Sequence, residues 1–154
     1  MSIVISYGPA CKKDCAEIYR WENDAGTRAM SDNVALFTYE THLDWFEKSL
    51  CNPNRQLYIA RNGYVAIGLI RFDATVDENF EVSLILNPDY RGKGLSTQVL
   101  SGGVCAFLQK NNGVRKIFAR VKTCNIASNK CFVTAGFKLI CSSEQYYNYA
   151  LEIL

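Results

Sequence analysis

Residues 86–100, "LNPDYRGKGLSTQVL", decide how the rest of the chain is interpreted. The stretch begins as the end of an apolar strand and finishes as the start of a helix. Between the two, Gly92 and Gly94 flank Lys93, and Arg91 precedes them. A turn needs one glycine at most. Two glycines beside two cations indicate that an anion approaches the main chain closely, because glycine has no Cβ to keep it away.

The composition is that of one ordinary globular domain. The chain has 154 residues, so we expect a single domain over residues 1–154. A net charge of +2 is too small to favour nucleic acid or an anionic membrane as the main partner. No apolar run approaches the roughly 18 residues of a membrane span, and the N-terminus shows no signal peptide. We therefore expect a cytoplasmic protein with neither nucleic acid nor membrane as a partner.

The cysteines favour the same compartment. There are 7 of them, unevenly spaced and without a CxxC pair, and His42 is the only histidine. We expect reduced thiols that act as small apolar side chains, and no bound metal. A redox or metal pair formed by Cys11 and Cys15 is the alternative.

Hydrophobic patterning predicts a mixed α/β (α+β) fold. Two β-rich runs in residues 56–72 flank Asn62-Gly63, a pair suited to a tight hairpin turn. Further strands are expected at 3–6, 80–86, 116–122, 137–141 and 146–153. Helices are expected at 12–22, 41–50, 97–110 and 127–136, with a polar loop over 23–33. This order predicts a mixed sheet of about seven strands with about four helices packed on it.

The glycine loop itself suits a diphosphate. The first amides of a helix have no internal partner, and the helix dipole is positive there. Arg91 and Lys93 would add a favourable field, and Ser96 or Thr97 could offer a hydroxyl. A glycine-rich turn with solvated cations is the simpler interpretation, since glycine loops are weak signals out of context.

Two motifs together resemble the GNAT N-acetyltransferases. "YRGKGLS" resembles their acyl-coenzyme A signature, R-x-x-G-x-[GA], and "NIASNKCFVTAGF" resembles their second motif, N-x-x-[AS]-x-x-x-[YF]-x-x-x-G-F. The resemblance implies the GNAT fold, with the fourth and fifth strands splayed apart, and acetyl-CoA as co-substrate without a metal. It also implies coenzyme contacts from Leu84, Ile85, Leu86, Arg91, Gly92, Lys93, Gly94, Leu95, Ser96, Thr97, Asn125, Ser128 and Phe132.

Acetyl transfer to an amine needs a group that accepts the amine proton and one that protonates the departing thiolate. Glu81 matches a glutamate that many relatives carry on the strand before the loop, so we expect it to be the base. The alternative is an ordinary exposed strand glutamate. Many relatives have a tyrosine where this chain has Phe132, which cannot donate a proton. Another hydroxyl (Tyr146, Tyr147 or Tyr149), water or the product ammonium must then supply it.

The N-terminal half resembles a narrower branch of that superfamily. The W-x-N-D, R-x-x-S, H-x-x-W-F and I-R-F-D elements resemble acetyltransferases of pseudaminic acid biosynthesis, which modify the 4-amino group of nucleotide-linked sugars. This resemblance implies a nucleotide-sugar acceptor, with Arg28, His42 and Arg71 as candidate contacts. Each of the three has a purely structural alternative, such as an ion pair or a local hydrogen bond. Acetylation of a protein N-terminus and a non-catalytic acyl-CoA sensor are the rival functions. The sequence leaves open whether the protein is a monomer or a homodimer.

Overall fold

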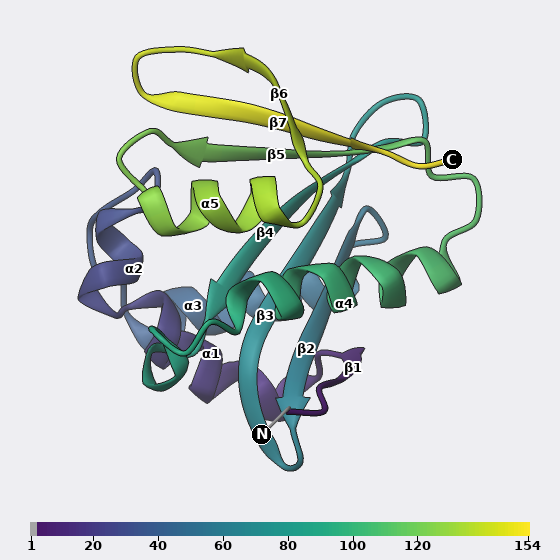
Figure 1. Ribbon diagram of the computed structural model, residues 1–154. Coiled ribbons are helices and arrows are strands. Elements are labelled where there is room, and N and C mark those ends of the chain that lie inside the picture. The colour runs from purple at the N-terminus through teal and green to yellow at the C-terminus, as the bar shows by residue number, and fades with distance from the viewer. Residues whose placement is uncertain (1–2) are drawn as a thin grey trace.

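The computed structural model describes residues 3–154, which form a single seven-stranded sheet in the order β1-β2-β3-β4-β5-β7-β6 (Figure 1). The strands are β1 Ser6–Pro9, β2 Arg55–Asn62, β3 Val65–Ala74, β4 Phe80–Leu86, β5 Lys116–Lys122, β6 Lys138–Ser142 and β7 Tyr146–Glu152. The helices are α1 Cys15–Glu22, α2 Ala25–Ala29, α3 Tyr39–Cys51, α4 Ser96–Lys110 and α5 Ile126–Thr134, with 3-10 turns η1 Lys12–Asp14 and η2 Pro88–Tyr90. The predicted α/β fold with a mixed sheet is confirmed.

The predicted hairpin forms the middle of the sheet. Strands β2 and β3 pair antiparallel from Arg55↔Asp73 to Asn62↔Val65, and Gly63 in the turn has a φ of +63°. Because side chains alternate along a strand, β2 contributes to two cores. Tyr58 belongs to one core cluster, and its neighbours Leu57 and Ile59 belong to the other.

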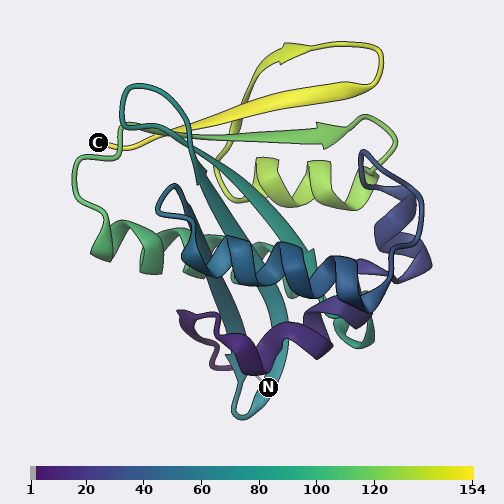
Figure 2. The same cartoon turned by 180° about the vertical axis from the view of Figure 1, so that it is seen from behind.

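Helices cover both faces of this sheet. α4 and α5 lie on one face (Figure 1), and α1 and α3 lie on the opposite face, which is turned toward the viewer in Figure 2. Phe107 of α4 stacks on Phe72 of β3 with ring centroids 4.0 Å apart. On the other face Trp21 of α1 and Phe46 of α3 are completely buried. The centre of the sheet is therefore covered by helices on both faces (Figure 1 and Figure 2).

The sheet opens between β4 and β5. These two strands are the parallel pair, and only Phe80↔Ile117 and Glu81↔Phe118 are matched. Beyond Glu81 the remainder of β4 diverges from β5, as Figure 1 shows. β5 continues to pair with β7 over its whole length. The predicted splay between the fourth and fifth strands is confirmed, and it leaves one edge of β4 free over residues 82–86.

Three sequence-based expectations need correction. The loop expected over 23–33 contains α2, so residues 3–154 contain five α-helices rather than about four. Asp24 caps α2 by accepting a 3.2 Å hydrogen bond from the Thr27 amide, a local signal that the polar composition hid. The first strand is Ser6–Pro9 rather than 3–6. The second predicted helix begins at Tyr39 rather than at 41, because Thr38 is its N-cap. Among the described residues, no helix is both long and apolar enough to cross a membrane.

Candidate active site

The glycine loop connects the open end of β4 to α4. Asn87 fixes the start of the loop and is only 2% exposed. Its side-chain Nδ2 donates to the Ala66 carbonyl at 2.9 Å, and its Oδ1 accepts from the Asp89 amide at 3.0 Å. Gly92 and Gly94 have φ values of +73° and +70°, and nothing lies within 4 Å of where a Cβ would be. The backbone is thus left-handed at these two glycines, and the space where their side chains would be is open.

The main chain of this loop offers a row of free donors. The first hydrogen bond of α4 runs from the Val99 amide to the Leu95 carbonyl, at 2.9 Å. Within residues 3–154, none of the amides from Gly92 to Gln98 donates a hydrogen bond. Such amides, at the positive end of the 15-residue helix α4, fit an anionic diphosphate. The residues present therefore fit acetyl-CoA.

Two adjoining cavities lie at the opening of the sheet. The loop cavity, of about 440 Å³, is lined by Gly26, Thr27, Met30, Ser31, Leu84, Ile85, Leu86, Arg91, Gly92, Ser96, Asn125, Ala127, Ser128 and Cys131. The split cavity, of about 400 Å³, contains Glu81, Leu84, Ile85, Asn125, Ser128, Phe132 and Tyr146 in its lining. Leu84, Ile85, Asn125 and Ser128 line both cavities. A ligand bound along the glycine loop can therefore reach the split between the strands.

The predicted coenzyme residues fall into three groups. Leu84, Ile85, Leu86, Arg91, Gly92, Ser96, Asn125 and Ser128 line the loop cavity. Phe132 lines the split cavity instead, and Lys93, Gly94, Leu95 and Thr97 line neither cavity. The Lys93 ammonium lies 5.1 Å from the centre of the Tyr90 ring. The Arg91 guanidinium is turned toward α2, where it forms an ion pair with Asp24.

The second motif forms the facing wall on α5. Asn125 is its N-cap, and its Oδ1 accepts a 3.1 Å hydrogen bond from the Ser128 amide. Phe132 is 4% exposed and packs edge-to-face on Phe137, with ring centroids 5.1 Å apart. Cys131 also lines the loop cavity, a position that the sequence analysis missed. Burial raises the pKa of the Cys131 thiol, and hydrogen bonds with Ser96 and Thr97 oppose this shift.

Glu81 lies where the two strands part. It is matched with Asp73 on β3 and with Phe118 on β5, and it is the last residue of β4 that β5 pairs with. Its half-buried side chain lines the split cavity. A carboxylate at this apex can accept a proton from an amine held in the cavity.

The three candidate tyrosines differ in position. Tyr146 lines the split cavity, and its hydroxyl donates a hydrogen bond to Asp32, which raises the pKa of Tyr146. Tyr149 is buried and donates to Asn129 at 2.6 Å, and Tyr147 packs against the core. Of the three, Tyr146 alone faces the candidate site.

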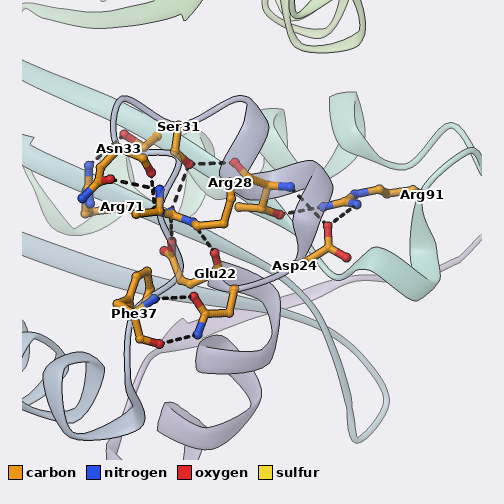
Figure 3. Close-up of polar contacts among 12 residues, drawn as sticks. Glu22, Asp24, Arg28, Ser31, Asn33, Phe37, Arg71 and Arg91 are labelled. Atoms are coloured by element: carbon orange, nitrogen blue, oxygen red, sulfur yellow. Dashed lines mark hydrogen bonds and ion pairs between the residues drawn. The ribbon is translucent and has the colours of Figure 1, made fainter.

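Arg28 lines the split cavity from the α2 side and is 8% exposed (Figure 3). Its Nε donates to the Glu22 carbonyl at 2.6 Å, and its Nη1 donates to the Asn33 carbonyl at 2.6 Å. Its Nη2 donates to the Glu22 carboxylate at 3.1 Å and to the Ser31 hydroxyl at 3.0 Å. Since guanidinium has five N–H groups, one remains for a ligand. Burial raises the pKa of Glu22, while Arg28 and Arg71 favour its charged form.

A third cavity adjoins the split cavity. This aromatic cavity, of about 390 Å³, is lined by Phe37, Thr41, His42 and Trp45, and it shares Glu22, Arg28, Asn33 and Arg71 with the split cavity. The three predicted acceptor contacts, Arg28, His42 and Arg71, thus lie around one space. His42 is 2% exposed and stacks on Phe37, with ring centroids 5.8 Å apart. Burial lowers the pKa of His42, so its imidazole is neutral near pH 7.

Comparison with known proteins gives the family. A family model described as an acetyltransferase (GNAT) domain matches residues 7–138. The chain belongs to the GNAT acetyltransferase family. It is accordingly an N-acetyltransferase, and acetyl-CoA is its co-substrate. None of the curated proteins matches the sequence. Within residues 3–154 no group of three or more potential ligand side chains is arranged to hold a metal ion.

Solved structures share the fold over nearly the whole chain. Spermidine N-acetyltransferase from Vibrio cholerae, in complex with CoA and spermine, has a TM-score of 0.83 at 14% identity, covering 96% of this chain and 95% of its own. YncA from Salmonella typhimurium, a putative acetyltransferase with its cofactor acetyl-CoA, has a TM-score of 0.77 at 21% identity, covering 96% and 93%. Aminoglycoside acetyltransferase AAC(6')-Ib, with coenzyme A, has a TM-score of 0.81 at 17% identity, covering 97% and 95%. At these identities the likeness is one of fold.

Proposed function

We propose that this acetyltransferase modifies the 4-amino group of a nucleotide-linked amino sugar. Both substrates are bound together, and the amine attacks the acetyl group directly. The observation that carries the proposal is the joining of the split cavity to the aromatic cavity through Arg71 and Arg28. The split would hold the amino sugar, and the adjoining space would hold the nucleotide.

The charges around the split cavity support an anionic acceptor. Two of its cations are paired within the lining, Arg28 with Glu22 and Arg120 with Asp32. Arg71 shares the single carboxylate of Asp73 with Arg55, which leaves that group with a positive charge. Within residues 3–154 Lys122 has no ion-pair partner, so Glu81 faces an excess of cations. A polyamine acceptor would favour the reverse arrangement.

The aromatic cavity supports a planar base next to a diphosphate. Phe37 and Trp45 line the cavity with aromatic surface against which a nucleobase can pack. His42 Nε2 is buried and has no hydrogen-bond partner in the described part of the chain, whereas Arg71 Nε lies 3.0 Å from Asp73 Oδ2 and is paired with it. Because buried polar atoms are normally paired, the unpaired His42 Nε2 beside the cavity supports a bound ligand there.

The residues of the chain have three roles in the proposed reaction: they orient acetyl-CoA, polarise a carbonyl oxygen and accept a proton. Acetyl-CoA supplies an activated acetyl thioester. The glycine loop and the wall of Asn125 and Ser128 orient it, and a free amide on the open edge of β4 can polarise a carbonyl oxygen. Glu81 accepts the proton that the acceptor amine loses as its nitrogen bonds the acetyl carbon. The carbon–sulfur bond of the thioester then breaks, and the departing coenzyme A thiolate takes a proton from the Tyr146 hydroxyl, from water or from the product ammonium. A sugar amine is a weaker base than a lysine side chain, so a single carboxylate suffices.

Thiol release from acetyl-CoA tests the proposal. The panel contains a UDP-4-amino-4,6-dideoxy sugar, spermidine, an aminoglycoside and a peptide with a free N-terminus. The same sugar nucleotide with its 4-amine already acetylated is the matched control. We expect kcat/KM for the amino sugar to exceed that for the other amines by at least about tenfold. A higher value for spermidine or the peptide would refute the sugar acceptor, and release with none of them would favour the acyl-CoA sensor.

The cysteines support a cytoplasmic setting for this reaction. All seven are free thiols, and Cys15 and Cys131 are buried among apolar side chains. Free thiols at this density suit a reducing compartment.

A further inference from the structure

The short helix α2 lies between the glycine loop and the cavities, and one side chain of the loop binds it. Arg91 Nη1 donates to Asp24 Oδ2 at 2.7 Å, and Nη2 donates to Thr27 Oγ1 at 2.6 Å (Figure 3). Gly26 allows this approach, because a Cβ there would lie 2.9 Å from Arg91 Nη1. The Arg91 guanidinium of the glycine loop is thus hydrogen-bonded to the start of α2.

The other end of α2 forms a wall that both cavities share. Met30 and Ser31, which follow the helix directly, line the loop cavity and the split cavity. Arg28 ties the same segment to Glu22 and to Ser31. A displacement of α2 would therefore move Met30 and Ser31, the wall against which an acceptor is held. Neither residue belongs to the glycine loop.

Few apolar contacts hold this helix. Its residues Ala25–Ala29 form less than two turns, which is too short to be stable alone. Of these residues only Arg28 is buried, and none belongs to either hydrophobic core cluster. Polar contacts at its two ends therefore determine its position. Arg91 binds Asp24 and Thr27 at the start, and at the finish Arg28 acts together with Asp32, which pairs with Arg120 and Tyr146.

We propose that Arg91 is a positioning residue for the acceptor side of the reaction. Through Asp24 and Thr27 it holds α2 against the glycine loop, so that Met30 and Ser31 form the common wall of the two cavities. The Asp24 carboxylate neutralises Arg91, which leaves Lys93 and the loop amides to attract the coenzyme. The inference rests on the proposed function only for the identity of the acceptor.

Substitutions on α2 test this without changing the coenzyme loop. Asp24→Asn keeps an N-cap for α2, since asparagine caps as well as aspartate, but it removes the charge that faces Arg91. Thr27→Val removes the second contact, and Thr27→Ser keeps the hydroxyl. Asp44→Asn, which breaks the exposed pair with Lys48 on α3, is the matched control.

We expect Asp24→Asn and Thr27→Val each to raise the KM of the amino-sugar acceptor by about fivefold. The Kd of acetyl-CoA for Asp24→Asn, measured by calorimetry, should change by less than about twofold, because Asp24 does not line the loop cavity and the loop amides are intact. Thr27→Ser should have an acceptor KM close to that of the wild type, because it keeps the hydroxyl that Thr27→Val removes. Asp44→Asn should change neither constant. Tighter acetyl-CoA binding in Asp24→Asn with an unchanged acceptor KM would overturn the proposal, because Arg91 would then be a coenzyme ligand that Asp24 restrains.

A second measurement separates this inference from the proposed function. If another amine of the panel is the substrate, the same KM comparison applies to it. If no amine reacts, hydrogen–deuterium exchange of the amides of residues 27–33, measured with coenzyme A bound, decides. Faster exchange in Asp24→Asn than in the wild type and Asp44→Asn supports the positioning role, and equal exchange in all three overturns it.

Discussion

Arg28 Nη2 lies 3.1 Å from the carboxylate of Glu22, and Arg28 Nε lies 2.6 Å from the carbonyl of the same residue. This buried pair lines both the split cavity and the aromatic cavity. A guanidinium that makes four hydrogen bonds to its own segment shapes the site more than it offers donors to a ligand. Substitution of Arg28 should therefore lower the free energy of unfolding more clearly than it weakens ligand binding.

Arg28→Met should lower the free energy of unfolding by about 3 to 5 kcal/mol, because it leaves the buried Glu22 carboxylate without its partner. The double variant Arg28→Met with Glu22→Gln should lose less, since no charge is then left unpaired. Urea denaturation measures both. A loss below about 1 kcal/mol in the single variant would mean that the pair is not buried in solution.

His42 should make stability depend on pH in a predictable direction. Burial lowers the pKa of its imidazole in the folded state, so below about pH 6.5 the unfolded chain binds the extra proton more readily. Stability is therefore lost as the pH falls from 6.5 through the lowered pKa. Glu22, whose pKa burial raises, acts in the opposite sense. A His42 variant that retains Glu22 therefore separates the contribution of His42 to the pH dependence of stability from that of Glu22.

His42→Phe preserves the aromatic packing and removes this titration. Thermal unfolding at about pH 7.5 and about pH 5.5 should show a larger loss for the wild type than for the variant. Since His42 is the chain's only histidine, no other histidine contributes in this range. Equal losses of thermal stability in the two proteins would mean that the His42 imidazole is exposed to water in the folded protein.

Glu81→Gln should reduce kcat by about a hundredfold or more if the carboxylate is the general base. The KM for acetyl-CoA should stay within about twofold, because the glycine loop is unchanged. Glu144→Gln, in the exposed turn between β6 and β7, is the control for charge alone. If kcat is the same for both variants, Glu81 has no part in proton transfer.

Gly94→Asp should weaken acetyl-CoA binding by more than about tenfold, because it adds bulk and a negative charge where the diphosphate approaches. Strain is a second consequence, since the φ of Gly94 is +70°. Gly63→Asp provides the matched control, since Gly63 has a φ of +63° in a hairpin turn away from the glycine loop. Calorimetry should find weak binding in Gly94→Asp only. Comparable weakening in both variants would indicate that strain, not the diphosphate, is responsible.

Much of the fold could be predicted because its signals are local. Asn62-Gly63 between two β-rich runs predicted the central hairpin, and the glycine loop predicted the junction between β4 and α4. The splay came from resemblance to a family, because the pairing of β4 with β5 depends on contacts between distant segments. α2 was missed because its stability comes from such contacts, above all Arg91 with Asp24 and Thr27.

The candidate site, like the fold, could be predicted from the sequence only in part. The sequence named Glu81 and the two motif walls, and the structure brings Glu81, Asn125, Ser128 and Phe132 around one opening. It did not name Cys131 or Met30 as cavity residues, since nothing in an isolated sequence shows which face of a helix meets the opening. Tyr146 could be separated from Tyr147 and Tyr149 only once the register of β7 was known.

The central claim is that the loop amides hold the coenzyme, and a crystal structure with acetyl-CoA tests it most directly. We expect diphosphate oxygens within about 3.2 Å of amide nitrogens of residues 92–98, with the thioester between β4 and β5 beside Glu81. A structure in which these amides contact only water, while the nucleotide binds elsewhere, would contradict the account.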